Sequence, residues 1–254
     1  MTVQTTDDAV LGGRLRLVQP KRGHRVGHDA ILLAAATEAQ AGERAIDLGA
    51  GVGAAGLALA HRVPGLNIDL VEIDAELCAL AAENARRNGL EGRVRAMVAD
   101  VTDARALSAA GIVTGAADRV LMNPPFNDPR VHQLSPDLRR RRAHAGHSTL
   151  LDSWSVAAHR LLKSGGVLTL IWRADPRDEV IATIAVRFGS IDIMPVLPSA
   201  DAPAIRILVR AVKDAAPETR DFAPLVLNDA AGKPTREAEA VLRGAEPLLF
   251  SEKS

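Results

Sequence analysis

The chain has 254 residues, of which 47% are hydrophobic and 24% are charged, a composition typical of one large folded domain. This composition excludes a disordered chain, a collagen and a coiled coil. The 31 basic and 31 acidic residues balance to a net charge of zero, and aromatic residues make up only 2%. Nucleic-acid-binding proteins usually have a basic surplus and stacking rings, so these two values count against that class.

Three further features bear on the cellular compartment. The longest wholly apolar run, residues 30–36, is far shorter than the roughly 20 residues of a membrane-spanning helix. The first residues have neither the basic start nor the apolar stretch of a secretory signal. The single cysteine, Cys78, excludes an internal disulfide and suits a reducing compartment. We therefore expect a cytoplasmic protein that does not enter a membrane.

The predicted elements follow one another as a hairpin, a helix and then alternating strands and helices. A Gly12-Gly13 pair between two short runs predicts a β-hairpin, and Gly27-His28-Asp29 precedes an apolar helix. From residue 44 onward the pattern predicts strands at 45–48, 67–73, 94–99, 119–122, 166–172, 191–197 and 205–212, and helices at 53–62, 75–88, 103–110, 148–163 and 176–188, with a polar, arginine-rich stretch at 127–147.

This order of elements predicts the α/β fold class, with a Rossmann-like, doubly wound and mostly parallel sheet of seven strands. The last two predicted strands have no helix between them, which indicates an antiparallel edge. A (β/α)8 barrel also fits the length, but the glycine-rich turn after the first strand favours an open sheet. We divide the chain into an N-terminal hairpin extension, residues 1–27, and a second domain, residues 28–254.

A glycine-rich loop at 47–56, Asp-Leu-Gly-Ala-Gly-Val-Gly-Ala-Ala-Gly, lies between a predicted strand and a predicted helix. Glycines let a ligand approach the backbone, and the helix N-terminus supplies amide donors. Gly51, Gly53 and Gly56 have the dinucleotide-binding spacing, and Glu72 follows at the distance expected of a ribose-binding acid. These features alone leave an NAD-binding oxidoreductase open.

Three acidic residues close the first three strands of the predicted sheet. Asp47 at the first strand suits a cationic ligand better than a pyrophosphate, Glu72 closes the second, and Asp100 closes the third. The neighbouring Asp74 is expected to cap the next helix instead, and each acid taken singly can be a helix cap or a surface carboxylate. Because the carboxyl ends of parallel strands meet at one edge, the three acids together predict one ligand crevice.

At this point the chain resembles the class I S-adenosylmethionine-dependent methyltransferases. In that family the glycine loop holds the methionyl end of the cofactor, the acid after the second strand takes the ribose hydroxyls, and the acid after the third takes the adenine amino group. The resemblance implies that S-adenosylmethionine is the cofactor and that its binding residues are Asp47, Gly49, Gly51 and Gly53, then Glu72, then Asp100 with the backbone amide of Val101.

The fourth predicted strand ends at Asn123-Pro124-Pro125-Phe126, the predicted catalytic residues. Two prolines cannot continue a strand, so the Asn123 amide and the Pro124 carbonyl are left at its carboxyl end. These two acceptors can hold both N–H groups of a weakly nucleophilic exocyclic or amide nitrogen, and the Phe126 ring can stack on a planar base. The simpler alternative is a turn whose prolines only end a strand.

After the glycine loop and the acids, this string resembles the signature of amino-methyltransferases that act on adenine, on guanine or on a glutamine side chain. Both ends of the chain resemble the bacterial tRNA (adenine-N6)-methyltransferase family, over about residues 8–243. The segments that carry this likeness are 11–13, 19–21, 27–29, 224–233 and Thr235. The chain departs from that family at Pro234, where an aromatic is usual, and at Phe126, where tyrosine is commoner.

The resemblance implies an exposed adenine of an RNA loop, in tRNA, as the substrate. Methylation of a protein glutamine amide or of an rRNA guanine stays open on the same scaffold. Two readings from other classes also stay open: the NAD-binding oxidoreductase, and an inactive RNA-binding module.

Two segments carry a local basic surplus despite the zero net charge. Residues 11–27 hold five basic residues and no acid, and residues 130–147 hold five arginines and one acid. Such runs are either solvated helix faces or phosphate-binding surfaces, and the place of the second run directly after the predicted catalytic turn favours RNA binding. The predicted RNA contacts include Lys21, Arg22, Arg139, Arg140, Arg141 and Arg142. We expect no metal, because His144 and His147 have no cysteine or acid companions.

Overall fold

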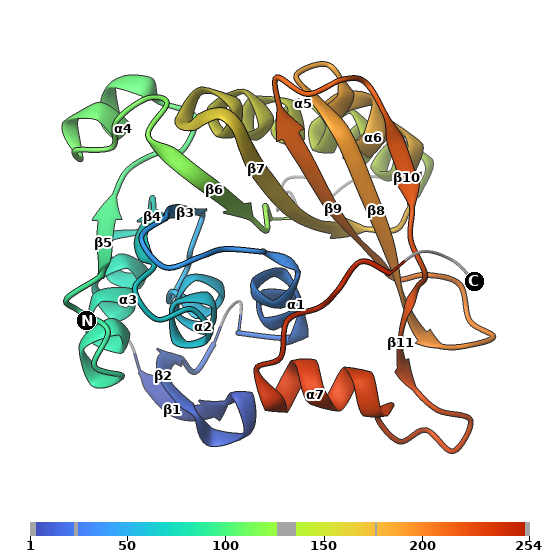
Figure 1. The fold of residues 1–254 in the computed structure, drawn as a ribbon, viewed down its shortest axis with the longest axis horizontal. Helices are drawn as coiled ribbons and strands as arrows, with labels where there is room; N and C mark the ends of the chain where they lie inside the picture. Colours follow the sequence, from blue (N-terminus) through green and yellow to red (C-terminus); the bar gives the residue numbers. More distant parts are fainter. Residues whose placement is uncertain (1–3, 23–24, 126–135, 176, 252–254) are drawn as a thin grey trace.

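The computed structural model describes residues 4–22, 25–125, 136–175 and 177–251, and for residues 136–148 it describes the backbone alone. A nine-stranded sheet forms the centre of the molecule (Figure 1), with the strand order β10-β8-β9-β7-β6-β3-β4-β5 and β11 also paired to β8. Its strands are β3 Arg44–Leu48, β4 Asn67–Glu72, β5 Val94–Val98, β6 Ala117–Met122, β7 Leu162–Arg173, β8 Phe188–Ser199, β9 Arg206–Lys213, β10 Thr219–Asp221 and β11 Leu225–Asn228.

The seven predicted strands and their mostly parallel arrangement are confirmed. Strands β5, β4, β3, β6 and β7 run parallel, and β9 runs antiparallel to both β7 and β8. The sequence did not predict β10 and β11, which pair in parallel along β8. They are short and partly exposed, so they have little apolar alternation to detect. The antiparallel strand β9 lies inside the sheet rather than at its edge, because it pairs with β7 on one side and β8 on the other.

Helices cover both faces of the sheet (Figure 1). The helices are α1 His28–Ala36, α2 Ala54–Arg62, α3 Ala75–Arg87, α4 Ala104–Ala109, α5 Pro136–Leu161, α6 Arg177–Ala185 and α7 Arg236–Gly244. Buried side chains of α1, α2 and α3 belong to one apolar core, and those of α4, α5 and α6 to another. Strand β6 contributes side chains to both cores, because Leu121 points to the first and its neighbours Val120 and Met122 point to the second.

Helix α5 is longer than the sequence predicted. It begins at Pro136, whereas the expected helix began at residue 148 after a polar stretch. The charged run was given no element of its own because it lacks an apolar stripe, yet arginine and alanine are good helix formers and proline suits the first turn of a helix. The predicted start of this helix at residue 148 was therefore wrong.

The N-terminal hairpin is confirmed as a separate two-stranded antiparallel sheet of β1, Thr5–Val10, and β2, Leu15–Pro20. The turn between them, Leu11–Gly13, places Gly12 and Gly13 at φ of 62° and 90°. Leu15 and Leu17 are fully buried in the core that α1, α2 and α3 share. The division of the chain at residue 27 stays a prediction.

The C-terminal segment returns to the hairpin and to α1. Helix α7 lies beside the hairpin turn (Figure 1), and the Arg14 guanidinium donates to the Arg243 carbonyl. After α7, the amide of Leu248 donates to the carbonyl of Ala35 at 2.9 Å. In the part of the chain with described coordinates, no helix is long and apolar enough to cross a membrane.

Candidate active site

Four parallel neighbours, β6, β3, β4 and β5, end at the same edge of the sheet. Leu48 of β3 pairs with Met122 of β6 and with Val71 of β4, and Glu72 pairs with Val98 of β5. The predicted acids and Asn123 lie at these pairs or within two residues of them, and the glycines of the loop begin directly after Leu48. The structure thus brings the glycine loop, Glu72, Asp100 and Asn123 to one edge, which is where open α/β sheets bind ligands.

The glycine loop folds tightly over the end of β3. The amides of Gly49 and Ala50 both donate to the Val71 carbonyl at 2.9 Å, and the Gly53 amide donates to the Ala50 carbonyl at 2.8 Å. Gly49, Gly51 and Gly53 have φ of 69°, 57° and 87°, a region that residues with a Cβ rarely adopt. A Cβ on Gly51 would meet no atom within 4 Å, so open space lies over the loop at that point.

Asp47 lies buried between β3 and α2, with 2% of its surface exposed. Its Oδ2 accepts a hydrogen bond from the Gly56 amide at 2.8 Å. Burial raises the pKa of the Asp47 carboxyl from 3.8 to about 7; the Gly56 N–H opposes the rise and the negative charge of Glu72 adds to it. The side chain therefore ties the strand to the helix beneath the loop, and its predicted contact with the cofactor stays a prediction.

Glu72 is also nearly buried, with 8% exposed, and it braces the loop from β4. Its Oε2 accepts from the Gly51 amide at 2.8 Å and its Oε1 from the Asp74 amide at 3.0 Å. A carboxylate has about four lone-pair positions, so these bonds leave capacity for hydroxyl donors. Asp74 caps α3 by accepting from the amides of Glu76 and Leu77, as predicted.

Asp100 follows β5 in a short turn of its own. Its Oδ1 accepts from the amide and the hydroxyl of Thr102, at 2.8 and 2.7 Å. The side chain of Val101 is buried in the core beneath α4 and α5. The ligand contacts expected of the Asp100 carboxylate and the Val101 amide stay predictions.

Asn123, directly after β6, carries an unusual acceptor. Its Oδ1 is buried and has no hydrogen-bond partner, one of three such side-chain atoms in the described residues. Leaving a buried acceptor unpaired costs roughly 1–3 kcal/mol, so an oxygen in this state is suited to a donor from a ligand. Pro124 is buried and Pro125 is exposed, whereas Phe126 lies outside the described residues.

One further residue at this edge was not singled out by the sequence reasoning. Ile73, between Glu72 and Asp74, is 65% exposed although the five residues before it are buried. An exposed apolar side chain at the carboxyl edge offers a surface for a flat ring. Alternation along the strand gave no signal for this exposure, because it puts Ile73 on the side of the buried Val71; the side chain is exposed because β4 ends at Glu72.

The basic segments are only partly as predicted. Lys21 and Arg22 are exposed, but Arg16 pairs with Asp7 at 3.1 Å and Arg25 with Asp8 at 2.9 Å. The surplus read along 11–27 is therefore reduced, because antiparallel pairing sets the acids of β1 opposite β2. The predicted contacts Arg139, Arg140, Arg141 and Arg142 lie in α5, where the structure describes the backbone alone.

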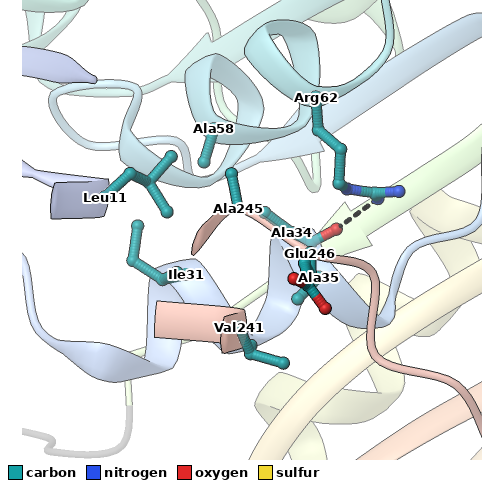
Figure 2. A pocket seen from close by; sticks show the side chains of 9 residues that line it. All are labelled: Leu11, Ile31, Ala34, Ala35, Ala58, Arg62, Val241, Ala245 and Glu246. Carbon is teal, nitrogen blue, oxygen red and sulfur yellow. Dashed lines mark hydrogen bonds between the residues drawn. The ribbon is translucent and has the colours of Figure 1, made fainter. Parts of the chain in front are cut away.

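Figure 2 shows a small pocket away from this edge, between the hairpin turn, α1, α2 and α7. It is mostly apolar, and the Arg62 guanidinium at its rim donates to the Ala34 carbonyl at 2.8 Å (Figure 2). None of the predicted site residues lines it. Across the described residues, no group of three or more histidine, cysteine, aspartate or glutamate side chains is placed to hold a metal ion.

Comparison with known proteins identifies the family. The model of the methyltransferase small domain matches residues 24–194, more than half of the chain. The chain belongs to this family. The predicted assignment to the S-adenosylmethionine-dependent methyltransferases, with that cofactor, is confirmed at this level, and the oxidoreductase alternative is set aside.

Two curated relatives and one solved structure place the chain within the family. A tRNA1(Val) (adenine(37)-N6)-methyltransferase of Dickeya chrysanthemi is 31% identical over 189 residues, which cover 73% of this chain and 71% of that protein. A release factor glutamine methyltransferase of Chlorobaculum tepidum is 31% identical over 156 residues, 59% of this chain and 52% of that protein. The match therefore spans about half the length of the second relative.

The solved structure is an Agrobacterium tumefaciens protein described as a predicted O-methyltransferase. It is 28% identical, has a TM-score of 0.73, and is matched over 87% of this chain and 98% of that chain. This likeness covers a larger share of the chain than the family model, whose match ends at residue 194.

Proposed function

We propose that this chain transfers a methyl group from S-adenosylmethionine to the exocyclic amino group of an adenine in RNA, with tRNA as the RNA class. The observation that carries the proposal is the buried, unpartnered Oδ1 of Asn123 at the end of β6. An acceptor in this state is matched by an N–H donor. It is not matched by an aliphatic substrate carbon, because a C–H group is not a conventional hydrogen-bond donor.

The residues around the loop fit the cofactor. Left-handed glycines leave open space over Gly51, and Glu72 keeps lone pairs for two hydroxyls, as a ribose requires. The exposed Ile73 beside Glu72 offers an apolar face for the adenine ring, and Asp100 a carboxylate for its amino group. When bound, S-adenosylmethionine supplies an electrophilic methyl group on a positively charged sulfur.

The chain's own part in the reaction is to orient the target nitrogen. The lone pair of an exocyclic amine is delocalised into the ring, so the nitrogen is a weak nucleophile. Asn123 Oδ1 accepts one N–H and the Pro124 carbonyl the other, which directs the lone pair at the methyl carbon and stabilises the positive charge that develops on nitrogen. The bound cofactor would supply the methyl group with loss of its S–C bond as the N–C bond forms, and the methylated nitrogen would then release its proton to water.

The choice of RNA rests on the relatives and on charge. The Dickeya relative is named for adenine N6-methylation of a tRNA, and the match covers 71% of its length. Lys21 and Arg22 are exposed on the hairpin, available to phosphate oxygens, and α5 with its arginine run follows the predicted catalytic turn. Methylation of a protein glutamine amide is the second candidate, because a glutamine methyltransferase is 31% identical and an amide N–H suits Asn123 equally well.

The experiment is methyl transfer from labelled cofactor into separate RNA and protein fractions, followed by identification of the modified nucleoside. Label in N6-methyladenosine of tRNA supports the proposal. Label in methylated guanine of rRNA refutes the proposal in favour of rRNA guanine methylation, and label in a protein glutamine refutes it in favour of glutamine methylation. A chain that binds no S-adenosylmethionine refutes it altogether.

Asn123→Ala tests the orienting role directly. We expect transfer to be lost while the affinity for S-adenosylmethionine stays within a few-fold, because Asn123 faces the acceptor rather than the cofactor. Asn228→Ala is the matched control, since Asn228 lies on β11 at the far edge of the sheet and bonds to the Pro198 carbonyl. If Asn123→Ala retains turnover, the proposed orienting role of Asn123 is refuted.

A further inference from the structure

Asn84, in the middle of α3, is fully buried and links two parts of the molecule that are distant in sequence. Its Oδ1 accepts from the Val18 amide of β2 at 2.7 Å, and its Nδ2 donates to the Val18 carbonyl at 3.0 Å. The same Nδ2 donates to the Val52 carbonyl in the glycine loop, also at 3.0 Å. One side-chain amide therefore holds the hairpin and the loop at once.

On the loop side, this bond completes a clamp on a single peptide group. The peptide between Val52 and Gly53 donates through its N–H to the Ala50 carbonyl at 2.8 Å and accepts through its C=O from Asn84. Because a peptide group is planar, bonds at both of its ends fix the orientation of the whole group. Gly51, its neighbour, is held in turn by Glu72. The loop conformation thus depends on three supports: its own turn, Glu72 and Asn84.

On the hairpin side, Asn84 does not act alone. Asn88, one helical turn later, accepts from the Arg16 amide at 3.0 Å and donates to the Arg16 carbonyl at 2.8 Å. Residues 16 and 18 are two apart on β2, so the side-chain amides of Asn84 in α3 and of Asn88, the residue that caps α3, pair with the outer edge of this strand as a neighbouring strand would. Asn88 also donates to the Asn84 carbonyl at 2.7 Å, and among the described residues no hydrogen bond joins its side chain to the loop, which makes it a matched control.

We propose that Asn84 is a positioning residue for the cofactor loop, and that it couples docking of the N-terminal hairpin to binding of S-adenosylmethionine. The inference rests on the proposed function, because the ligand of the loop is that cofactor. Ordering of the loop by the cofactor favours the Asn84 orientation that also holds β2. By reciprocity, whatever fixes the hairpin, including phosphates on Lys21 and Arg22, raises the affinity for the cofactor.

The first test compares Asn84→Ala with Asn88→Ala by calorimetric titration of S-adenosylmethionine into the full chain. Each change removes three hydrogen bonds, and two of the three go to β2 in both cases. We expect Asn84→Ala to raise Kd at least about fivefold, because Val52 loses its donor, and Asn88→Ala to change it less than about twofold. Thermal melts confirm that both variants are folded at the titration temperature.

Equal Kd changes in the two variants overturn the assignment to Asn84, since the hairpin contacts that both variants lose then explain the effect without the bond to Val52. A wild-type chain with no measurable affinity for the cofactor refutes the proposed function instead, so the two failures are distinguishable. If Asn84→Ala does not fold, the exchange experiment on the wild-type chain decides the question.

A second test uses the wild-type chain and needs no variant. Amide hydrogen exchange is measured over β2 and over the glycine loop, with and without saturating S-adenosylmethionine. We expect the cofactor to slow exchange in both segments, although β2 carries none of the predicted cofactor-binding residues. Protection of the loop with unchanged exchange in β2 overturns the inference.

Discussion

Replacing Asp47 by asparagine tests whether a buried carboxyl lies under the glycine loop. In the folded chain the pKa of Asp47 is raised from 3.8 to about 7, chiefly because burial disfavours the charged form. This rise corresponds to about 4 kcal/mol of preference for the neutral carboxyl. Asparagine keeps an acceptor oxygen for the Gly56 amide and cannot ionise, so the variant removes the titration and retains the hydrogen bond.

The sign follows from proton binding in the two states. Between pH 3.8 and about 7 the folded chain holds a proton on Asp47 that the unfolded chain has lost, so stability falls as pH rises through this range. The contribution is fully present below pH 3.8 and is lost above about pH 7. From about pH 5.5 to about pH 8 we expect the wild type to lose about 2 kcal/mol more unfolding free energy than Asp47→Asn.

The assay is urea unfolding of both chains at several pH values, compared through the slope of unfolding free energy against pH. The slope is the right quantity because a constant cost of the asparagine NH2 cancels from it. Glu72→Gln is a second arm: removing that charge lowers the pKa of Asp47 and moves the transition to lower pH. Parallel curves for the wild type and Asp47→Asn would refute the reasoning.

Three further predictions concern the glycine loop, the cofactor face and the hairpin. Gly49→Ala should destabilise the chain by about 2–4 kcal/mol in urea unfolding, because φ is 69° and the new Cβ would overlap the Trp154 ring; a loss below about 1 kcal/mol contradicts the packing. Ile73→Ser should weaken S-adenosylmethionine binding about three- to tenfold in calorimetry with unchanged stability, and equal affinity excludes the side chain from the ring contact. The double change Lys21→Glu and Arg22→Glu should weaken tRNA binding. It should also reduce the slope of log affinity against log salt concentration by an amount equal to about two phosphate contacts, and an unchanged slope excludes a contact between these residues and RNA.

Much of the site could be read from the sequence because its residues sit at recognisable ends of elements. The loop glycines indicate left-handed conformations. Glu72 and Asn123 each follow an apolar run that forms a buried stretch of strand, and Asp47 and Asp100 lie near the ends of two neighbouring strands. Strand order in a doubly wound sheet then brings such ends to one edge. The sequence likewise predicted the hairpin, from its glycine pair and short alternating runs.

Other features depend on which segments meet in space, and no local pattern contains them. The raised pKa of Asp47 comes from burial beneath α2 and the nearby charge of Glu72. The pairing of Arg16 with Asp7 removed part of a basic surplus that looked unopposed along the chain. Strands β10 and β11 form only because β8 offers them an open edge.

Asn84 shows most clearly the difference between what the sequence predicts and what the tertiary contacts decide. Its sequence neighbours predicted a helix and nothing more, since an asparagine in a helix interior carries no directional signal. Only the tertiary structure set it between β2 and the glycine loop, where one amide bonds to both backbones. The sequence by itself determined the fold class, the succession of strands and helices along the chain, and the edge at which the candidate site residues gather, because these follow from local periodicity and turn residues. The tertiary structure decided the charges, the burial and the couplings, because these are set by neighbours tens of residues away.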